Sequence, residues 1–225
     1  FNPNFVPNAD NPNENGLSGL FAQASGSGRA GNLTITTPAL LVQDLAQISV
    51  ATAGTGDGGA LTINTHQLWV KNKAEISAST SGNGTGGMLM INASRFVELT
   101  GEGSLSARST GLGAAGSLTL NTDRLLMNNG QASVSSSSLG NAGNLEIYAR
   151  SVFLANNSSL TAETQSGGGG NIQLRILDRL LLSGSRISAS TETGQGGKLS
   201  LVVGRAVELL NGSGLFAQAT RISGK

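Results

Sequence analysis

Apolar and polar residues alternate in short runs along most of the chain, and the runs return at a constant distance. The segment GNLTI at 31–35 comes back six times in edited form, each time with two large apolar side chains on one side of the alternation. The glycines that open the seven copies are Gly31, Gly59, Gly87, Gly116, Gly143, Gly170 and Gly197. Subtracting neighbouring positions gives spacings of 28, 28, 29, 27, 27 and 27 residues, a period that indicates a repeat protein.

Each repeat holds three such alternations, and their period of two residues predicts β-strands rather than helices. In the first full repeat the pairs expected to face the core are Leu33/Ile35, Leu40/Val42 and Ile48/Val50, and every later repeat carries an equivalent set. The third alternation is rich in small residues, and its least regular pair is Ala132/Val134. The pattern therefore predicts three short strands per repeat, each with one buried face.

The connections between these strands are too short for a crossover within one repeat, so each strand must pair with its counterpart in the next repeat. Stacking at about 4.8 Å per repeat then gives three parallel sheets around a narrow core. The predicted fold class is all-β: a single-stranded right-handed parallel β-helix (β-solenoid) of about seven coils of 27–29 residues with three short strands each. The periods of hexapeptide helices, propellers and leucine-rich repeats do not fit.

Residues 1–16 differ from the repeats, since they contain three of the four prolines and six asparagines. This composition predicts an irregular Asn/Pro-rich lead-in or linker. Phe5 and Val6 are the residues that would dock on the first coil and cover it. Residues 17–225 form the predicted β-helix repeat domain, and its last coil is expected to be incomplete.

The composition contains little charge and no cysteine. Charged residues make up 12% of the chain, and the formal net charge is +1. Such a chain has no global field that attracts nucleic acid, and it offers neither a disulfide nor a thiolate metal site. No apolar run approaches the length of a membrane span, so we expect neither nucleic-acid binding nor membrane insertion.

Four segments match the dinucleotide fingerprint GxGxxG. They begin at Gly26, Gly54, Gly82 and Gly111. A phosphate cradle needs a helix that leaves the glycines, whereas here each match recurs at the repeat period and leads into a predicted strand. The segment GQGGKLS around Lys198 also precedes a strand, and Asp57 is the one carboxylate placed as in a calcium-binding β-roll. We therefore expect no cofactor and no metal.

The sequence also contains little that resembles a catalytic site. His66, the single histidine, and Asp123 share an offset of seven from their repeat glycines, but they lie two coils apart, about 9.6 Å at the stacking distance. β-Helical enzymes that cut acidic polysaccharides instead cluster carboxylates and basic groups on one exposed sheet. We predict that the chain is not an enzyme, and we assign no catalytic residue.

One arginine per repeat lies near the second strand in the five C-terminal repeats. These residues are Arg95, Arg124, Arg150, Arg179 and Arg205, at offsets of seven to nine from the repeat glycines. Stacked guanidinium groups would contact a polyanion, such as an acidic glycan, at several points. In the alternative interpretation the arginines extend into solvent at a turn and are partly neutralised by Asp123 and Asp178.

Serine and threonine form a second regular feature, as in the sequence ISAST at 76–80 and again at 187–191. We expect exposed hydroxyl ladders that hydrogen-bond along a sheet face, each adding roughly tenths of a kcal/mol. An ice-binding face would need a strictly repeated TxT array, which the sequence lacks.

Three segments carry a family resemblance: SGLFAQASGSGRAGNLTI at 18–35, the ISAST-G-G-GG-L-I pattern that begins at Ile76, and SLTAETQSGGGGNIQL at 159–174. Residues 17–225 resemble the repeat region of filamentous-haemagglutinin-type exoproteins, especially the large secreted ones of cyanobacteria. The resemblance implies a right-handed β-helical passenger that is exported by two-partner secretion through an outer-membrane transporter, is displayed or shed at the bacterial surface, and serves adhesion. The family's secretion motifs NPNL and NPNG are only half matched by NPNE at 11–14, so we assign no transporter-recognition role there.

The functional prediction is a secreted structural or adhesive β-helix, such as a stalk, fibre or adhesin shaft, with surface glycans or other cells as partners. A carbohydrate-binding or carbohydrate-active β-helix is one alternative. A subunit of a head-to-tail extracellular filament is another, because SGLFAQA at 18–24 returns at 213–219 at the same phase of the coil. Its partner interaction would be end-to-end self-association.

Overall fold

The computed structural model describes residues 18–137 and 139–219, and these residues form seventeen β-strands and no helix. Within this part of the chain no helix is therefore long and apolar enough to cross a membrane. One sheet contains β1 (Gly19–Ala24), β4 (Gln47–Thr52), β6 (Glu75–Ser77), β8 (Ser104–Ser106), β10 (Gln131–Ser133), β12 (Ser159–Thr161), β14 (Arg186–Ser188) and β17 (Gly214–Phe216). The other contains β2 (Leu33–Thr36), β3 (Ala39–Gln43), β5 (Ala60–Lys71), β7 (Met88–Thr100), β9 (Ser117–Asn128), β11 (Asn144–Ala155), β13 (Asn171–Ser183), β15 (Leu199–Val203) and β16 (Ala206–Leu210).

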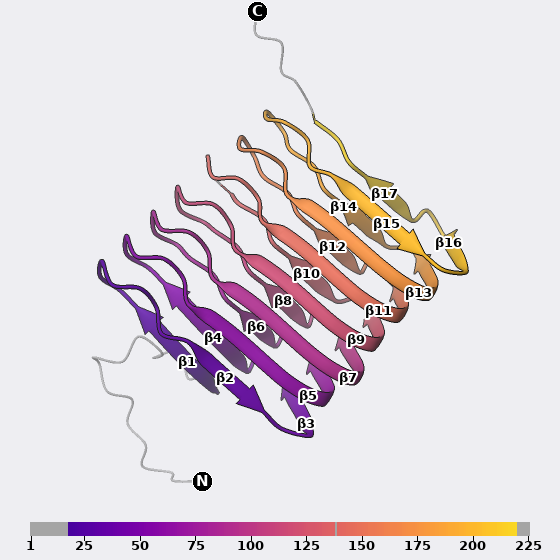
Figure 1. Cartoon of the computed structure of the whole chain (residues 1–225), viewed down its shortest axis with the longest axis horizontal. Coiled ribbons are helices and arrows are strands. Elements are labelled where there is room, and N and C mark those ends of the chain that lie inside the picture. The colour runs from indigo at the N-terminus through magenta and orange to yellow at the C-terminus, as the bar shows by residue number, and fades with distance from the viewer. Residues whose placement is uncertain (1–17, 138, 220–225) are drawn as a thin grey trace, which may run out of the picture.

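The coils lie side by side along one axis, each stacked on the one before it (Figure 1). Every pairing between strands is parallel and joins a strand to its counterpart one coil away. Leu61 pairs with Leu89, for example, and these two residues are 28 positions apart. The stack has about seven turns, so the predicted parallel β-helix is confirmed.

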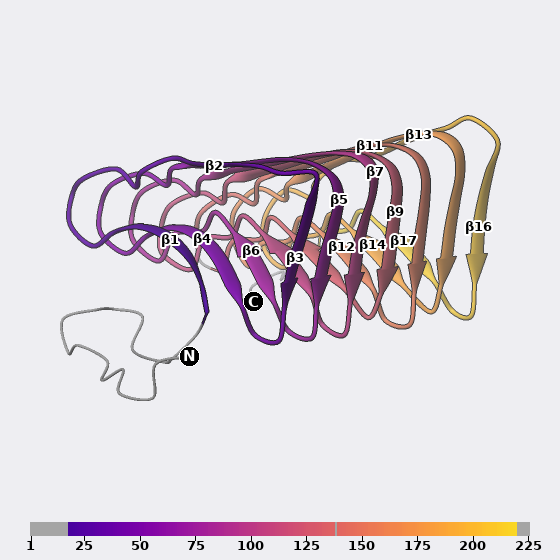
Figure 2. The ribbon, with the colours of Figure 1, turned by 90° about the horizontal axis from the view of Figure 1, so that it is seen from below.

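The first two predicted strands of each repeat run together in the five inner coils. β5, β7, β9, β11 and β13 are continuous over 12 or 13 residues, whereas the edge coils keep separate strands, β2 and β3 at one edge and β15 and β16 at the other. The register shifts midway, as between Thr65 and Gln67, and there the long strands bend (Figure 2). A bulge lets the pairing continue around a bend. The three predicted strands of a coil therefore belong to two hydrogen-bonded sheets rather than to the three sheets predicted.

The predicted inward pairs form the core. In the coil that contains β7 they are Leu89/Ile91, Val97/Leu99 and Leu105/Ala107, and none of these side chains is more than 1% exposed. The irregular pair Ala132/Val134 is also buried, and Ala132 pairs with Leu105 as the prediction required. Each fully buried large apolar side chain contributes about 1.5–3 kcal/mol through the hydrophobic effect, so coils stabilise one another mainly through this column of residues.

The repeat glycines are required by the close stacking of the loops that precede the first strand. A Cβ atom at Gly116 would overlap the carbonyl oxygen of Gly87 in the coil before it, and Gly59, Gly87, Gly143, Gly170 and Gly197 have the same relation to their predecessors. Gly111 and Gly113 meet the carbonyls of Gly82 and Gly84 in the same way. Where the GxGxxG pattern occurs in successive coils, it therefore marks three files of close backbone contact that leave no room for a side chain.

The turn between the second and third segments is built from residues with positive φ. Asn72 and Lys73 have φ values of 55° and 63°, and Asn156 and Asn157 have values of 51° and 65°. Asparagine tolerates this left-handed region better than most residues, which accounts for its recurrence here. The amide of Asn72 also donates to Asp44 Oδ1 at 2.8 Å, so the side chains join neighbouring coils as well.

Candidate functional site

The predicted arginines all lie at the bend of the long strands, but they occupy two adjacent files. We call the first file the corner column; it consists of the residues immediately before the second segment of each coil. Its members are Pro38, His66, Arg95, Asp123, Arg150, Asp178 and Arg205. The next file, the shoulder column, contains Gln67, Phe96, Arg124, Ser151, Arg179 and Ala206 in paired register.

The arginines therefore do not form one continuous stack. Arg95, Arg150 and Arg205 belong to the corner column, where they alternate with aspartates, while Arg124 and Arg179 belong to the shoulder column and are separated by Ser151. β7 and β13 have 13 residues where β5, β9 and β11 have 12, and the extra residue falls at the bend. Counting from the repeat glycine misses this shift.

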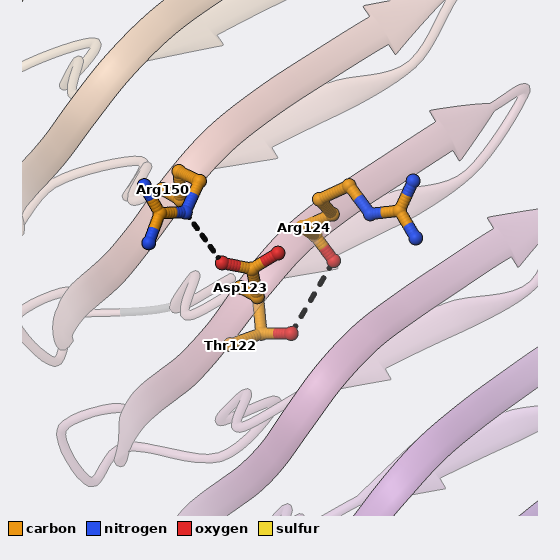
Figure 3. Close-up of polar contacts among 4 residues, drawn as sticks. All are labelled: Thr122, Asp123, Arg124 and Arg150. Carbon is orange, nitrogen blue, oxygen red and sulfur yellow. Dashed lines mark hydrogen bonds and ion pairs between the residues drawn. The ribbon is translucent and has the colours of Figure 1, made fainter.

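Three of the five guanidinium groups face a carboxylate. Arg150 Nε lies 2.8 Å from Asp123 Oδ1 (Figure 3), and Arg205 Nη1 lies 3.5 Å from Asp178 Oδ1. Arg179 Nε lies 3.7 Å from Glu208 Oε1. All three pairs are well exposed, so each stabilises the fold by roughly 0–1 kcal/mol and is weakened by salt.

Arg95 and Arg124 form no ion pair with the residues that the structure describes. Both are exposed, and the Arg124 side chain extends away from Asp123 (Figure 3). The part of the predicted polyanion surface that is open to a ligand thus consists of these two residues on neighbouring coils. Polyanion contact itself stays a prediction.

A shallow groove of about 630 Å³ runs beside the corner column on the N-terminal half of the helix. Its walls include an amide ladder in which Asn121 donates to Asn92 at 2.8 Å and Asn92 donates to Asn64 at 2.9 Å. His66 Nδ1 lies 2.8 Å from Ser94 Oγ one coil away. Asp123 is turned to Arg150 instead, so the groove brings together hydrogen-bonding groups but no paired acid and base.

Asp57, the one loop carboxylate considered for calcium, holds the next coil. Its Oδ1 accepts hydrogen bonds from the Thr85 backbone N–H at 2.9 Å and from the Thr85 hydroxyl at 2.8 Å. These two bonds lower the pKa of Asp57 below its ordinary value of 3.8. Across residues 18–137 and 139–219, no three His, Asp or Glu side chains gather as a metal site would require.

The serine and threonine ladders are mostly buried rather than exposed, which corrects the prediction, and only their middle serines, Ser79 and Ser190, are half-buried. Ser77 and Ser188 are only 7% and 4% exposed, and Thr80 and Thr191 only 2% and 3%. The ladder does bond along the axis, since Ser77 Oγ donates to Ser49 Oγ at 3.1 Å. Neighbouring coils cover side chains this small almost completely, so the hydroxyls act within the stack and offer little surface to a ligand.

Sequence reasoning missed an aromatic pair on the outer face of the second segment. The rings of Trp69 and Phe96 meet edge to face, with centroids 5.0 Å apart and planes at 79°. Phe96 pairs with Arg124 in the shoulder column, so the pair borders one of the two arginines without an acidic partner. The signal was present, because both aromatic residues stand at outward positions of the period-two pattern.

These features define a parallel β-helix with one polar and partly aromatic corner. Comparison with protein-family models, with characterised proteins and with solved structures gave no match. The resemblance to filamentous-haemagglutinin-type exoproteins therefore stays a prediction based on the repeat motifs.

Proposed function

We propose that this β-helix is a structural shaft of a secreted or surface-displayed bacterial exoprotein, a stiff spacer that carries adhesive contacts away from the cell. The observation that carries the proposal is the uninterrupted parallel register from coil to coil, which shifts only at the bend. Every coil contributes to the same core column and carries the glycine that precedes its first strand, so mechanical continuity is the property that the whole chain repeats.

Single-molecule stretching tests the mechanical part of the proposal. One coil of 27–29 residues corresponds to about 95 Å of extended chain, so a shaft that peels coil by coil should lengthen in steps near that value. The uniform ladder of backbone hydrogen bonds is the reason to expect steps of similar force. Release of the whole chain in one step at low force would contradict a mechanical role.

Deleting a single coil tests whether the coils are interchangeable. Removal of residues 88–116 joins Gly87 to Ser117, which occupies the register position of Met88. A spacer shortened in this way should fold and support attachment of coated beads to cells as the full chain does. The matched control is deletion of 88–101, which removes half a coil, breaks the register and should unfold the protein. If the whole-coil deletion folded but no longer supported attachment, the adhesive function would lie in the deleted coil and not in the shaft as a whole.

Localisation is tested on cells of the source organism. An antibody raised against residues 18–219 should label intact cells or the culture medium. Labelling that requires permeabilised cells would rule out a surface shaft.

A glycan-binding role is the second candidate, and the aromatic pair beside Arg124 favours it. Aromatic faces stack on sugar rings, and a guanidinium without an acidic partner binds carboxylate or sulfate groups. Trp69 is the only tryptophan in the chain, so its fluorescence reports directly on this surface. A sulfated glycan should quench or shift the emission while a neutral glycan does not, and Arg124→Ala should weaken the effect. A depolymerase assay on the same glycan distinguishes binding from cleavage.

A further inference from the structure

The two edges of the eight-stranded sheet are made of the same seven residues. SGLFAQA occupies 18–24 at β1 and 213–219 at β17, the outermost strands of that sheet. Leu20 and Leu215 both continue the inward column, through Ile48 and Ile187 respectively. Phe21 and Phe216 both fold back over the glycine two residues earlier, Gly19 and Gly214. The edges thus match in sequence, phase and local packing.

Both edges leave core positions open. Leu20 is 49% exposed, and Val207 and Leu209 are each 44% exposed, whereas Leu68 and Val70 at the inner counterparts of the latter two are fully buried. The backbone groups of edge strands are also a template for another strand. Both edges therefore expose the apolar side chains and backbone groups through which one coil normally packs against the next.

The first loop of the β-helix points to the same conclusion. Among residues 18–137 and 139–219, a Cβ atom at Gly26 or Gly28 would have no neighbour within 4 Å, and one at Gly31 would have only Ala22 Cβ, at 3.9 Å. In every later coil the equivalent of Gly31 must be glycine, because the carbonyl of the coil beneath lies against it. A glycine at 31 has this steric reason only when another coil lies beneath it.

The order of the strands decides how two copies fit. One edge presents β1, β2 and β3 in chain order, and the other presents β15, β16 and β17. If β2 and β3 of a second copy pair with β15 and β16, its β4 arrives one coil spacing beyond β17. β17 then stands where β1 of the second copy would be. We propose that β17 displaces β1 and that two copies join head to tail by exchange of this strand.

The exchange preserves what β4 contacts, because the two heptapeptides are identical. Ile48 would pair with Leu215 in place of Leu20, and the Gln47 N–H, now 2.9 Å from the Ser18 carbonyl, would donate to that of Ser213. The joint would also cover Val207 and Leu209 with the first coil of the second copy. The inference deepens the proposed shaft, since a shaft would grow by adding copies of itself.

Light scattering and sedimentation of the full chain over a thousandfold range of concentration test the association. The mean mass should rise with concentration, and electron microscopy should show rods of one coil's width and variable length. A monomer at every concentration would overturn the proposal and would assign the edges to another occupant. The stretching steps of a single chain would be unaffected, so failure here is distinguishable from failure of the shaft itself.

Gly31→Val tests the joint without disturbing the single chain. In the monomer a Cβ atom at position 31 meets only Ala22 Cβ, at the ordinary contact distance of 3.9 Å, whereas in the joint the side chain would overlap Gly197 of a second copy. We expect an unchanged melting temperature and association at least tenfold weaker. Association equal to that of the native chain would overturn the proposal.

Matched changes in the two heptapeptides separate strand exchange from simple stacking. Leu215→Asp alters the strand that stays in the joint and should weaken association at least tenfold. Leu20→Asp alters the strand that is displaced, so association should be unchanged or stronger. Equal weakening by both variants would overturn strand exchange.

Discussion

The inner coils and the edge coils of this β-helix carry the same sequence pattern and differ in what lies next to them. In the coils of β5 to β13 the first two segments form one continuous strand, and the core side chains are almost fully buried. At the edges the segments separate into β2 and β3 or β15 and β16, and the equivalent side chains other than Val42 are half-buried or exposed. The difference shows that a repeat has no core of its own, because its burial comes from the coils on both sides.

Truncation of one core leucine should give the largest contrast between the two regions. Leu118 is fully buried between Leu89 and Leu145, so Leu118→Ala should lower the free energy of unfolding by about 2–5 kcal/mol. Leu33→Ala changes the same file at the first coil, where the side chain is half-buried, and should cost roughly half as much. Urea denaturation followed by circular dichroism measures both. Equal losses would mean that edge coils are as well packed as inner ones.

The repeat glycine offers a second contrast of similar design. Gly116→Ala places a methyl group on the Gly87 carbonyl and should destabilise the protein by about 1–3 kcal/mol, because the coils must move apart. The methyl group of Gly31→Ala meets only Ala22 Cβ, at the ordinary contact distance of 3.9 Å, and should have little effect. Hydrogen exchange should show loss of protection in β7 and β9 for the first variant only. A tolerated Gly116→Ala would refute the steric explanation of the GxGxxG files.

The sequence predicted the parts of the fold that depend on burial. A period of two directly reports which side chains face the core, so even the irregular pair Ala132/Val134 was placed correctly. It did not predict that two strands would merge, since the polar residues around His66 resemble a turn. The backbone nevertheless stays paired there, with the His66 N–H donating to the Pro38 carbonyl at 3.0 Å.

The candidate site was less predictable because it depends on single-residue shifts and on neighbours in space. One extra residue at the bend of β7 and β13 moves the arginines between two files, and no count along the chain reveals it. The burial of Ser77 likewise depends on Ser49 and Ser106 above and below it. Such features require knowledge of which side chains the stacking brings together.

A pH test compares two side-chain hydrogen bonds between neighbouring loops, a charged one at Asp57 near one edge and a neutral one at Asn141 in an inner coil. The lowered pKa of Asp57 means that its carboxylate stabilises the fold above the ordinary value of 3.8 and that this contribution is lost as the pH falls through the lower folded value. Asn141 Oδ1 accepts from the Gly168 N–H at 2.7 Å and does not titrate. Hydrogen exchange in acid should therefore show the loop of Thr85 opening before that of Gly168. Asp57→Asn should remove this difference while keeping an acceptor, and a difference that persists would assign it to other groups.

The ion pairs of the corner column should show the smallest difference between inner and edge coils. Arg150–Asp123 lies in inner coils at 2.8 Å, and Arg205–Asp178 reaches the last coil at 3.5 Å, but both arginine side chains are more than 60% exposed. Solvent screens both pairs, so Arg150→Ala and Arg205→Ala should each change the free energy of unfolding by less than about 1 kcal/mol, and added salt should reduce even that. Denaturation at low and high salt measures the effect. A large loss of stability for Arg150→Ala alone would mean that ion pairs, like core side chains, stabilise inner coils more than edge coils. Two small losses would mean that inner and edge coils differ in packing and not in charge pairing.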